Sequence, residues 1–259
     1  MGIPKVSVII PCYNEEKNIK NAINSILSQT FSNFELIISD NCSTDNTVQI
    51  VEQFADSRIR LIKNSKNMGV IWSRNNAISL SRGKYIAVLD GDDTCEPSRL
   101  EKQVSYMDSH PECILCGTFA DVYDGKEIKK QGRQIKNLKK YLTKNNPFIH
   151  SSAMYLRIVD GEIVSYPDRR PFEDYALWIK LSTHGDFYII PEVLVHRTDF
   201  NNLGTKDIWT GYNTKHAVYK KLVEYQFSAI KATGYWIPGF FYLFPTIGKA
   251  IVSGFSKTK

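Results

Sequence analysis

The sequence predicts an α/β protein whose mostly parallel sheet is flanked by helices. Two observations carry this prediction. Short apolar runs rich in β-branched residues alternate four times with stretches of helical periodicity within about the first 90 residues. Each of these apolar runs is also followed by a polar loop. Because every helix returns the chain to the same end of the sheet, such alternation produces parallel strands.

The first unit begins with the apolar run 6–10, which is typical of a buried parallel strand, and Pro11 is expected to end it. The chain then turns at 12–15. From Glu16 onward, apolar residues recur at helical spacing, namely at Ile19, Ala22, Ile23, Ile26 and Leu27. This part of the chain is therefore expected to form a strand, a loop and a helix, in that order.

The second unit is of the same type. Residues 35–39 are expected to form a strand, residues 40–45 a polar loop and residues 47–54 a helix. Ser43 and Asp45 are the candidate caps of that helix, because both residue types accept hydrogen bonds from the first free N–H groups of a helix.

The third and fourth units complete the alternation. A strand over 59–63, a turn at 67–69 and a helix over 71–81 lead into a fourth strand over 85–89. This last strand stops abruptly at 90–93, where three carboxylates occupy four positions. Such a cluster indicates either a divalent cation, which prefers oxygen ligands, or an Asp-rich turn.

The polar loops after these strands are expected to converge. The carboxyl ends of parallel strands share one edge of a sheet, and ligands bind outside that edge. The loops at 11–15, 40–45, 67–75 and 90–93 should therefore lie together although they are scattered in the sequence.

The second half of the chain loses the alternation and is expected to be mixed. A helix should follow Pro97 and stop at His110 and Pro111. Further strands are expected at 114–123, 153–157 and 187–197, and a further helix at 172–182. A turn is expected at 124–125, a basic, loop-rich segment at 126–146, and helix in the first part of 209–259.

Composition limits the classes of partner and compartment. The net charge of +6 suits an anionic ligand, a membrane surface or nucleic acid, but no nucleic-acid recognition motif is evident, so we expect no nucleic-acid partner. Five irregularly spaced cysteines favour a reducing compartment, and Cys113 and Cys116 are expected to be buried apolar residues. With no signal-peptide pattern and no long apolar stretch, we expect a cytoplasmic protein.

The C-terminal segment is crowded with aromatic residues between 234 and 245 and is followed and preceded by lysines. This composition favours an element at a membrane surface, which would make the protein peripheral on the cytoplasmic face. The alternative is packing on the protein's own core or on a second subunit. The sequence leaves the oligomeric state open.

Five motifs occur in order along the chain: VIIPCYNE (8–15), SDNCSTD (39–45), NMG (67–69) with Arg74 and Asn75, DGDD (90–93) and FEDYALW (172–178). Together this set resembles the family 2 inverting glycosyltransferases with the GT-A fold, over roughly residues 4 to 200. The resemblance implies a Rossmann-like sheet, a mixed acceptor-binding half and a C-terminal helical extension.

The resemblance implies a metal-dependent donor site. Asp92 would ligate Mn²⁺ or Mg²⁺, which neutralises the leaving diphosphate, and Asp90 would share the metal or face the ribose. Asp93 would act as an outer group. The remaining residues implied in nucleotide-sugar binding are Pro11, Tyr13, Glu15, Asp40, Asn41 and Arg74. A UDP-sugar is the expected donor. GDP- and dTDP-sugars are kept as alternatives, because this chain has Asn41 where many relatives have an acid.

The resemblance also implies an acceptor side. Asp174 would be the base that takes the proton of the acceptor hydroxyl. The alternative for Glu173 and Asp174 is a favourable negative charge at a helix N-terminus. His150 would border the acceptor cleft, unless it is only a structural donor. Three further cations are candidates for contact with the diphosphate or a charged acceptor: Arg170, His196 and Arg197.

The resulting hypothesis is a glycosyltransferase of polysaccharide, lipopolysaccharide or glycoprotein glycan biosynthesis, acting on a glycan or lipid-linked acceptor. We expect a nucleotide-sugar-binding half at 1–100, an acceptor-binding half at 101–205 and a C-terminal extension at 206–259. A GT-A-like nucleotidyltransferase is one alternative, although 11–18 lacks the Gly-rich basic loop of that class. A catalytically silent nucleotide-binding relative is the other.

Overall fold

The computed structural model describes residues 2–123, 127–168, 172–198 and 215–235, together with residues 243, 245–247 and 249. The chain divides into two compact units, which we describe separately. Unit 1 consists of Met1–Arg133, Phe148–Tyr166 and Tyr188–Thr198. Unit 2 consists of Gln134–Pro147, Pro167–Phe187 and Asp199–Lys259.

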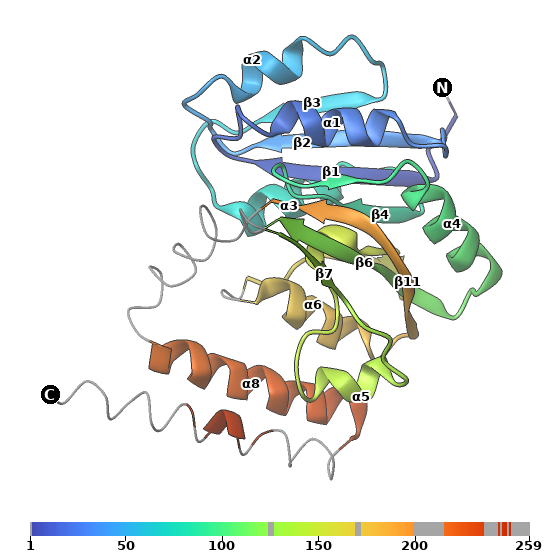
Figure 1. Ribbon diagram of the computed structural model, residues 1–259, viewed down its shortest axis with the longest axis vertical. Helices are drawn as coiled ribbons and strands as arrows, with labels where there is room; N and C mark the ends of the chain where they lie inside the picture. The colour runs from blue at the N-terminus through green and yellow to red at the C-terminus, as the bar shows by residue number, and fades with distance from the viewer. Residues whose placement is uncertain are drawn as a thin grey trace, which may run out of the picture. The chain divides into compact units, whose positions relative to one another are not determined.

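The parallel half of the sheet lies in unit 1 and confirms the predicted alternation. Its strands are β1 (Val6–Cys12), β2 (Phe34–Asp40), β3 (Ile59–Lys63) and β4 (Tyr85–Val88). They lie side by side in the order β3-β2-β1-β4 and are parallel throughout (Figure 1). The connecting helices are α1 (Ile19–Leu27), α2 (Thr47–Glu52) and α3 (Val70–Ser79).

Strands β1 and β2 form the centre of the core. All seven residues of each strand are buried. Burial on both faces favours apolar side chains at successive positions, which is why the middles of these strands, 8–10 and 36–38, appear in the sequence as apolar runs. Helix α1 contributes Ile19, Ala22, Ile23 and Ile26 to the same core cluster, as its periodicity predicted.

Strand β1 passes through Pro11, where the sequence predicted its end, and stops at Cys12. The backbone hydrogen bonds explain the difference. Ile9 O accepts from Leu89 N on the β4 side (3.2 Å), whereas Cys12 O accepts from Asn41 N on the β2 side (2.9 Å). Alternate residues face alternate neighbours, so Pro11 faces the β4 side, beyond the last β1–β4 pair at Ile9. Its missing N–H therefore removes no bond from the ladder.

The antiparallel half completes one mixed, nine-stranded sheet in the order β3-β2-β1-β4-β8-β6-β11-β5, with β7 paired to β6. Its strands are β8 (Met154–Leu156), β6 (Cys113–Tyr123), β11 (Asp186–Arg197), β5 (Thr94–Cys95) and β7 (Ile128–Gln131). Helix α4 (Arg99–Ser109), the 3₁₀ turn η1 (His150–Ser152) and the hairpin β9 (Ile158–Val159) and β10 (Glu162–Ile163) accompany it. Cys113 and Cys116 are buried free thiols on β6, as expected.

The segment 126–146 contains more regular structure than predicted. Among the described strands, β7 pairs with β6 alone. Most of its residues stay exposed, so its sequence Ile-Lys-Lys-Gln lacks the apolar pattern of a buried strand. Helix α5 (Leu138–Leu142) has five residues and buries only Leu138 and Leu142. Two apolar side chains are too few to produce a recognisable helical period. The predicted turn at 124–125 lies outside the described residues.

Unit 2 is built from helices. Helix α6 (Glu173–Leu181) confirms the helix predicted at 172–182, and α8 (Lys215–Thr233) shows that the first part of the C-terminal extension is helical. Helix α8 contacts both α5 and α6. Most of the aromatic run that begins at Tyr235 lies outside the described residues. In the part of the chain that the structure describes, every helix is too short or too polar to cross a membrane.

Candidate active site

The loops that follow β1, β2 and β3 are joined by side-chain hydrogen bonds at the carboxyl edge of the sheet. Asn14 N donates to Ser43 Oγ (2.9 Å), which connects the first loop to the second. Asn41 Nδ2 donates to Asn67 Oδ1 (2.7 Å), which connects the second loop to the third. The predicted convergence of these loops is confirmed.

The acidic turn after β4 closes the same edge. Arg74 on α3 donates through Nη2 to Asp90 Oδ1 (2.9 Å). On the other side, a Cβ added at Gly91 would lie 3.3 Å from Cγ of Glu15 and 3.5 Å from the carbonyl oxygen of Pro11. The first and fourth loops are therefore packed against each other, and a side chain at position 91 would require the side chain of Glu15 to shift slightly.

Asp40 and Asn41 shape the loop after β2 and are both buried. Asp40 Oδ2 accepts from the backbone N–H groups of Cys42 and Ser43 (both 3.1 Å), which holds Cys42 in a left-handed conformation with φ of 67°. Asn41 Oδ1 accepts from Met68 N (2.9 Å). The same oxygen accepts from Asn64 Nδ2 (3.3 Å), and the amide nitrogen of Asn41 donates to Asn67.

The predicted helix caps behave differently from each other. Asp45 Oδ1 accepts from Thr47 N (3.0 Å) at the start of α2, and Asp45 Oδ2 accepts from Glu16 N (3.0 Å). Asp45 therefore satisfies N–H groups of two segments. Burial opposes its ionised form, but the hydroxyl of Thr47 and these N–H groups outweigh burial and lower the pKa of Asp45. Ser43 donates to Asp40 instead and does not cap the helix.

Asp90 is held by three partners. Besides Arg74, its carboxylate accepts from Ser151 Oγ (3.2 Å) and lies 3.4 Å from Nδ1 of His150. His150 is oriented in turn by the hydroxyl of Tyr166, 2.9 Å from its Nε2. Burial by itself would raise the pKa of Asp90, but His150 and Arg74 outweigh it and hold this pKa well below its usual range. Asp90 is therefore an ionised, fixed carboxylate.

Asp92 and Asp93 of the turn, and Glu15 of the loop after β1, are poorly neutralised. Burial and the charges of Asp92 and Asp90 raise the pKa of Glu15 to about 7, against the bond that it accepts from Asn18. Burial and the same two charges raise the pKa of Asp93 to about 7, although Ser151 donates to it. The pKa of Asp92 is raised as well, first by burial and then by Asp90. The cluster therefore carries more negative charge than its protein neighbours balance.

The carboxylates of the acidic turn fit a divalent cation whose coordination shell is completed by oxygen atoms of a bound substrate. Among the described residues, no group of three acidic, His or Cys side chains is arranged to hold a metal alone. Mg²⁺ sites, however, commonly take one or two carboxylates plus phosphate oxygens and water. Asp92 suits that use, because within the described chain its carboxylate bonds only to its own backbone N–H. Asp90 is already occupied by Arg74, His150 and Ser151.

His196 and Arg197 lie at the end of β11, next to this cluster. His196 bridges two carboxylates, with Nδ1 2.8 Å from Asp121 Oδ1 and Nε2 2.8 Å from Glu96 Oε1. Burial opposes the charged imidazole, but these two acids outweigh it and raise the pKa of His196. Arg197 Nε lies 3.8 Å from Asp93 Oδ2, and its Nη1 donates to Gln131 Oε1 (2.9 Å).

Asp174 lies in unit 2, in the first turn of α6. Its Oδ2 accepts from Asn146 Nδ2 (2.7 Å), and its Oδ1 accepts from Tyr175 N (2.7 Å). Glu173 precedes it in the same turn, and Phe172 before the helix adopts a left-handed conformation with φ of 73°. A non-glycine residue in this conformation is uncommon and is held by its surroundings.

Helix α8 supports the segments that carry Asp174 and Asn146. Gln226 Nε2 donates to the carbonyl oxygen of Lys144 (2.7 Å), two residues before Asn146. The buried ring of Tyr225 lies 6.2 Å from that of Phe172 and 5.7 Å from that of Tyr175. Helix α8 therefore fixes both the first turn of α6, which carries Asp174, and the loop that carries Asn146.

Several residues of the site are not evident from the sequence. Asn146, Tyr166 and Thr198 carry no motif. Tertiary folding alone brings Asn146 to Asp174 in unit 2, and Tyr166 and Thr198 to His150 and Asp93 in unit 1. Thr198 N, for example, donates to Asp93 Oδ1 (3.1 Å). Ser151 follows His150 in the sequence and could have been found from that adjacency. The candidate Arg170 lies outside the described residues.

Comparison with known proteins decides the family. Residues 7–163, more than half of the chain, match the family model for glycosyl transferase family 2. The chain belongs to this family. The matched residues include the whole acidic cluster, whereas Asp174 and α8 of this glycosyltransferase lie beyond them. The resemblance stated from the five motifs is thus confirmed at the level of the family.

Named relatives support the assignment. The chain is 34% identical over 179 residues to the Escherichia coli UDP-Glc:alpha-D-GlcNAc-diphosphoundecaprenol beta-1,3-glucosyltransferase WfgD, covering 68% of this chain and 69% of the relative. Among solved structures, S. aureus TarS 1-349 in complex with UDP-GlcNAc matches with a TM-score of 0.74 at 20% identity, over 98% of this chain and 76% of TarS. The Pyrobaculum calidifontis mannosyltransferase PcManGT, solved with GDP-Man and Mn²⁺, has a TM-score of 0.65 at 16% identity, over 99% and 76% of the two chains. These structural matches confirm the α/β GT-A fold, with its mixed sheet flanked by helices.

Proposed function

We propose that this glycosyltransferase moves a sugar from a nucleoside-diphosphate sugar to a hydroxyl of a glycan or lipid-linked acceptor in polysaccharide biosynthesis, with Mn²⁺ or Mg²⁺ and with inversion at the anomeric carbon. The observation that carries the proposal is the acidic turn after β4. Among the described residues, the carboxylate of Asp92 bonds only to its own backbone N–H, and burial together with neighbouring negative charge raises the pKa of both Glu15 and Asp93 to about 7. A diphosphate with a bound cation would balance this charge.

The donor would bind across the four loops at the carboxyl edge of unit 1. Tyr13 is 45% exposed and offers a ring to the nucleotide, beside Pro11 and Glu15. Asn41 would offer its remaining amide hydrogen to the base, while Asp40 keeps the loop in shape. Arg74 would act through Asp90, which it holds at 2.9 Å. Asp92 would hold the cation, and Asp90 the ribose or a water of the cation.

The names of the relatives favour particular substrates. UDP-sugars occur in the names of WfgD and the TarS complex, whereas PcManGT was solved with GDP-Man and Mn²⁺. We therefore propose a UDP-sugar donor, with GDP- and dTDP-sugars as alternatives. WfgD acts on a diphosphoundecaprenol-linked sugar. A lipid-linked acceptor of this chemical class is our proposal for this chain, and it would bring the protein to a membrane surface.

In the proposed reaction, the acceptor oxygen bonds to the anomeric carbon as the bond from that carbon to the diphosphate oxygen breaks. The electron pair of the broken bond leaves with the diphosphate, and the hydroxyl proton passes to the carboxylate of Asp174. A single displacement of this kind inverts the anomeric carbon. When bound, the cation would act as a Lewis acid on the leaving group. Asn146 would hold Asp174 in place, and Glu173 and His150 would border the acceptor.

The proposal is tested by a thermal-shift screen with UDP, GDP, CDP and dTDP, each with and without Mn²⁺, followed by transfer assays with the matching sugar nucleotides. Ligands that bind the native state raise its melting temperature. We expect one diphosphate to stabilise the protein far more with Mn²⁺ than without it, and its sugar to be transferred. Release of pyrophosphate from a nucleoside triphosphate would favour the nucleotidyltransferase alternative. Binding without turnover across the donor panel would favour a silent relative.

A further inference from the structure

The two units of the chain differ sharply in charge. Unit 2 contains 15 Lys and Arg residues against seven Asp and Glu, whereas unit 1 contains 18 against 20. The net charges are therefore +8 and −2, so the positive charge of the protein is concentrated in unit 2. A distribution of this kind is the electrostatic footprint of an anionic partner that contacts one unit only.

Part of this charge lies on and around α5. Residues 134–147 contain four lysines and no acidic residue. We define Lys136, Lys139, Lys140 and Lys144 as the lysine surface. The apolar side chains of the helix, Leu138 and Leu142, are buried on the protein side, which leaves the lysines for the outside.

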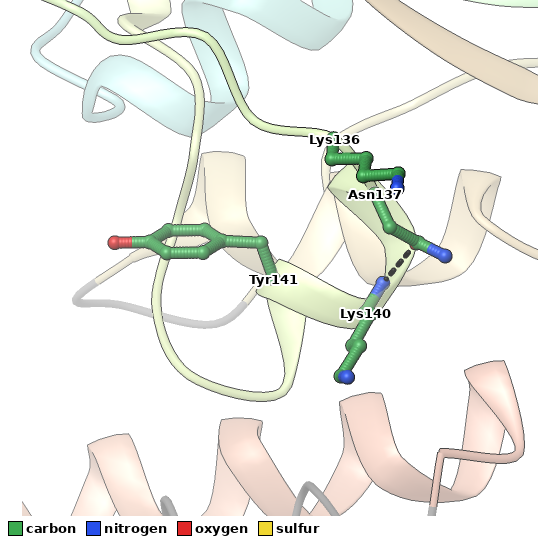
Figure 2. A pocket seen from close by; sticks show the side chains of 4 residues that line it. All are labelled: Lys136, Asn137, Lys140 and Tyr141. Carbon is green, nitrogen blue, oxygen red and sulfur yellow. Dashed lines mark hydrogen bonds between the residues drawn. The ribbon is translucent and has the colours of Figure 1, made fainter.

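The centre of the lysine surface is a shallow pocket of about 420 Å³ lined by Lys136, Asn137, Lys140 and Tyr141 (Figure 2). Lys136 and Lys140 are four residues apart, and neither forms a salt bridge in the described part of the chain. Lys139 differs from them, because its Nζ lies 3.1 Å from Asp186 Oδ1. Two unneutralised ammonium groups beside one pocket are suited to phosphate oxygens.

The lysine surface adjoins the start of the aromatic segment. Asn137, whose side chain lines the pocket, donates through Nδ2 to the hydroxyl of Tyr235 (2.9 Å), and its Oδ1 accepts from Lys140 N (2.8 Å). Tyr235 is the first residue of the sequence run that contains Trp236 and Phe240. Lysines next to Tyr and Trp are typical of proteins that lie at a membrane interface.

We propose that the lysine surface binds the headgroups of an anionic phospholipid membrane, with unit 2 rather than unit 1 facing the lipid. Clusters of four or more lysines bind anionic leaflets, and each lysine near the surface strengthens binding about fivefold. The lysine surface takes no part in the proposed sugar transfer. Membrane binding by this surface can therefore be tested independently of the reaction.

The test is co-sedimentation of the purified protein with vesicles of phosphatidylglycerol mixed with phosphatidylcholine, and with vesicles of phosphatidylcholine alone. We expect binding to the mixed vesicles only, with an affinity that falls steeply as salt is raised. The double variant Lys136→Gln and Lys140→Gln should bind about 25-fold more weakly, because two lysines are lost. Circular dichroism and the melting temperature check that the variant is folded.

The matched control is Lys17→Gln with Lys20→Gln, which removes the same charge from two exposed lysines of unit 1. The control should bind as the wild type does. Equal binding by the Lys136 and Lys140 variant and the wild type would overturn the proposal, as would equal binding to both kinds of vesicle. The proposal would also fail if the wild type ignored lipid while the variant raised the KM for a diphosphate-linked acceptor in detergent. In that case the lysines would contact the acceptor.

Discussion

The carboxylates that we assign to the two halves of the reaction are held in opposite ways. In unit 1, Glu15 from the loop after β1 lies near Asp90, Asp92 and Asp93 of the turn after β4. Of these four, only Asp90 has a pKa that its Arg and His neighbours hold below the usual range. In unit 2, Asp174 accepts a hydrogen bond from the neutral amide of Asn146 (2.7 Å). One set is short of positive charge, and the other carboxylate is fixed by an amide.

The difference separates two chemical tasks. A crowded set of carboxylates gains free energy when a cation arrives, which suits the half that neutralises a leaving diphosphate. A carboxylate oriented by an amide donor is held in a fixed geometry, which suits a general base. The variants below either remove this difference between the carboxylates of the two units or measure it.

The largest effect is expected from Asp92→Asn. This change removes the carboxylate that would hold the cation, whose charge stabilisation is worth several kcal/mol. Sugar transfer should therefore fall by at least about 100-fold, and Mn²⁺ should no longer increase the affinity for the nucleoside diphosphate. Calorimetric titration of UDP with and without Mn²⁺ measures the second effect. An unchanged metal dependence would mean that the acidic turn has another purpose.

The next largest effect is expected from Asn146→Asp, which crowds the carboxylate in unit 2. Asn146→Asp places a second carboxylate beside Asp174, so that unit 2 also contains a crowded pair. The like charge should raise the pKa of the base, because it disfavours the ionised form. The acid limb of the pH–rate profile should therefore move to higher pH, with the loss at neutral pH recovered on alkaline titration.

Asn146→Ala is the matched control for that variant. It removes the same hydrogen bond without adding charge, so transfer should fall by about tenfold near neutral pH, as for the loss of one hydrogen bond to a charged group, and the acid limb should move less far than in Asn146→Asp. Nucleotide binding should be unchanged in both variants. If both had wild-type kcat values and pH profiles, Asn146 would have no part in positioning Asp174.

The smallest effect concerns His196, which bridges Asp121 and Glu96 and so shows a third way of neutralising carboxylates. Its pKa is raised above the usual 6.5, so its bonds stabilise the fold fully below pH 6.5 and lose this contribution as the pH rises through the raised pKa. His196→Gln should therefore lower the free energy of unfolding more in acid than in alkali. Urea denaturation at a series of pH values measures the difference, and a pH-independent difference would contradict this role.

The parallel half of the sheet and its polar edge could be predicted from the sequence because their signals are local. Buried strands such as β1 appear as apolar runs, and α1 shows its helical period at Ile19 and Ile23. Strand β7 and helix α5 were missed because both are lysine-rich and bury few side chains. An exposed edge strand and a five-residue helix leave almost no apolar pattern.

The site shows a similar division. Asp90, Asp92 and Asp174 are found from motifs, and the structure gives each a distinct environment. The partners that create these environments are distant in the sequence. Ser151 and Thr198 lie 50 or more residues from the acidic turn, and Asn146 lies 28 residues from Asp174. The roles of His196 and Arg197 as ion-pair partners likewise depend on the return of β11 to β5. Such pairings follow from the tertiary fold and leave no local signal.

The central claim is that one half of the reaction belongs to the acidic turn and the other to Asp174. Its most direct test is the Asp174→Asn variant, examined for both Mn²⁺-dependent UDP binding and sugar transfer in the same preparation. We predict wild-type binding, with transfer reduced by about 100- to 10,000-fold, the contribution of a general base. Transfer at the wild-type rate, or a loss of Mn²⁺-dependent binding along with transfer, would contradict the claim.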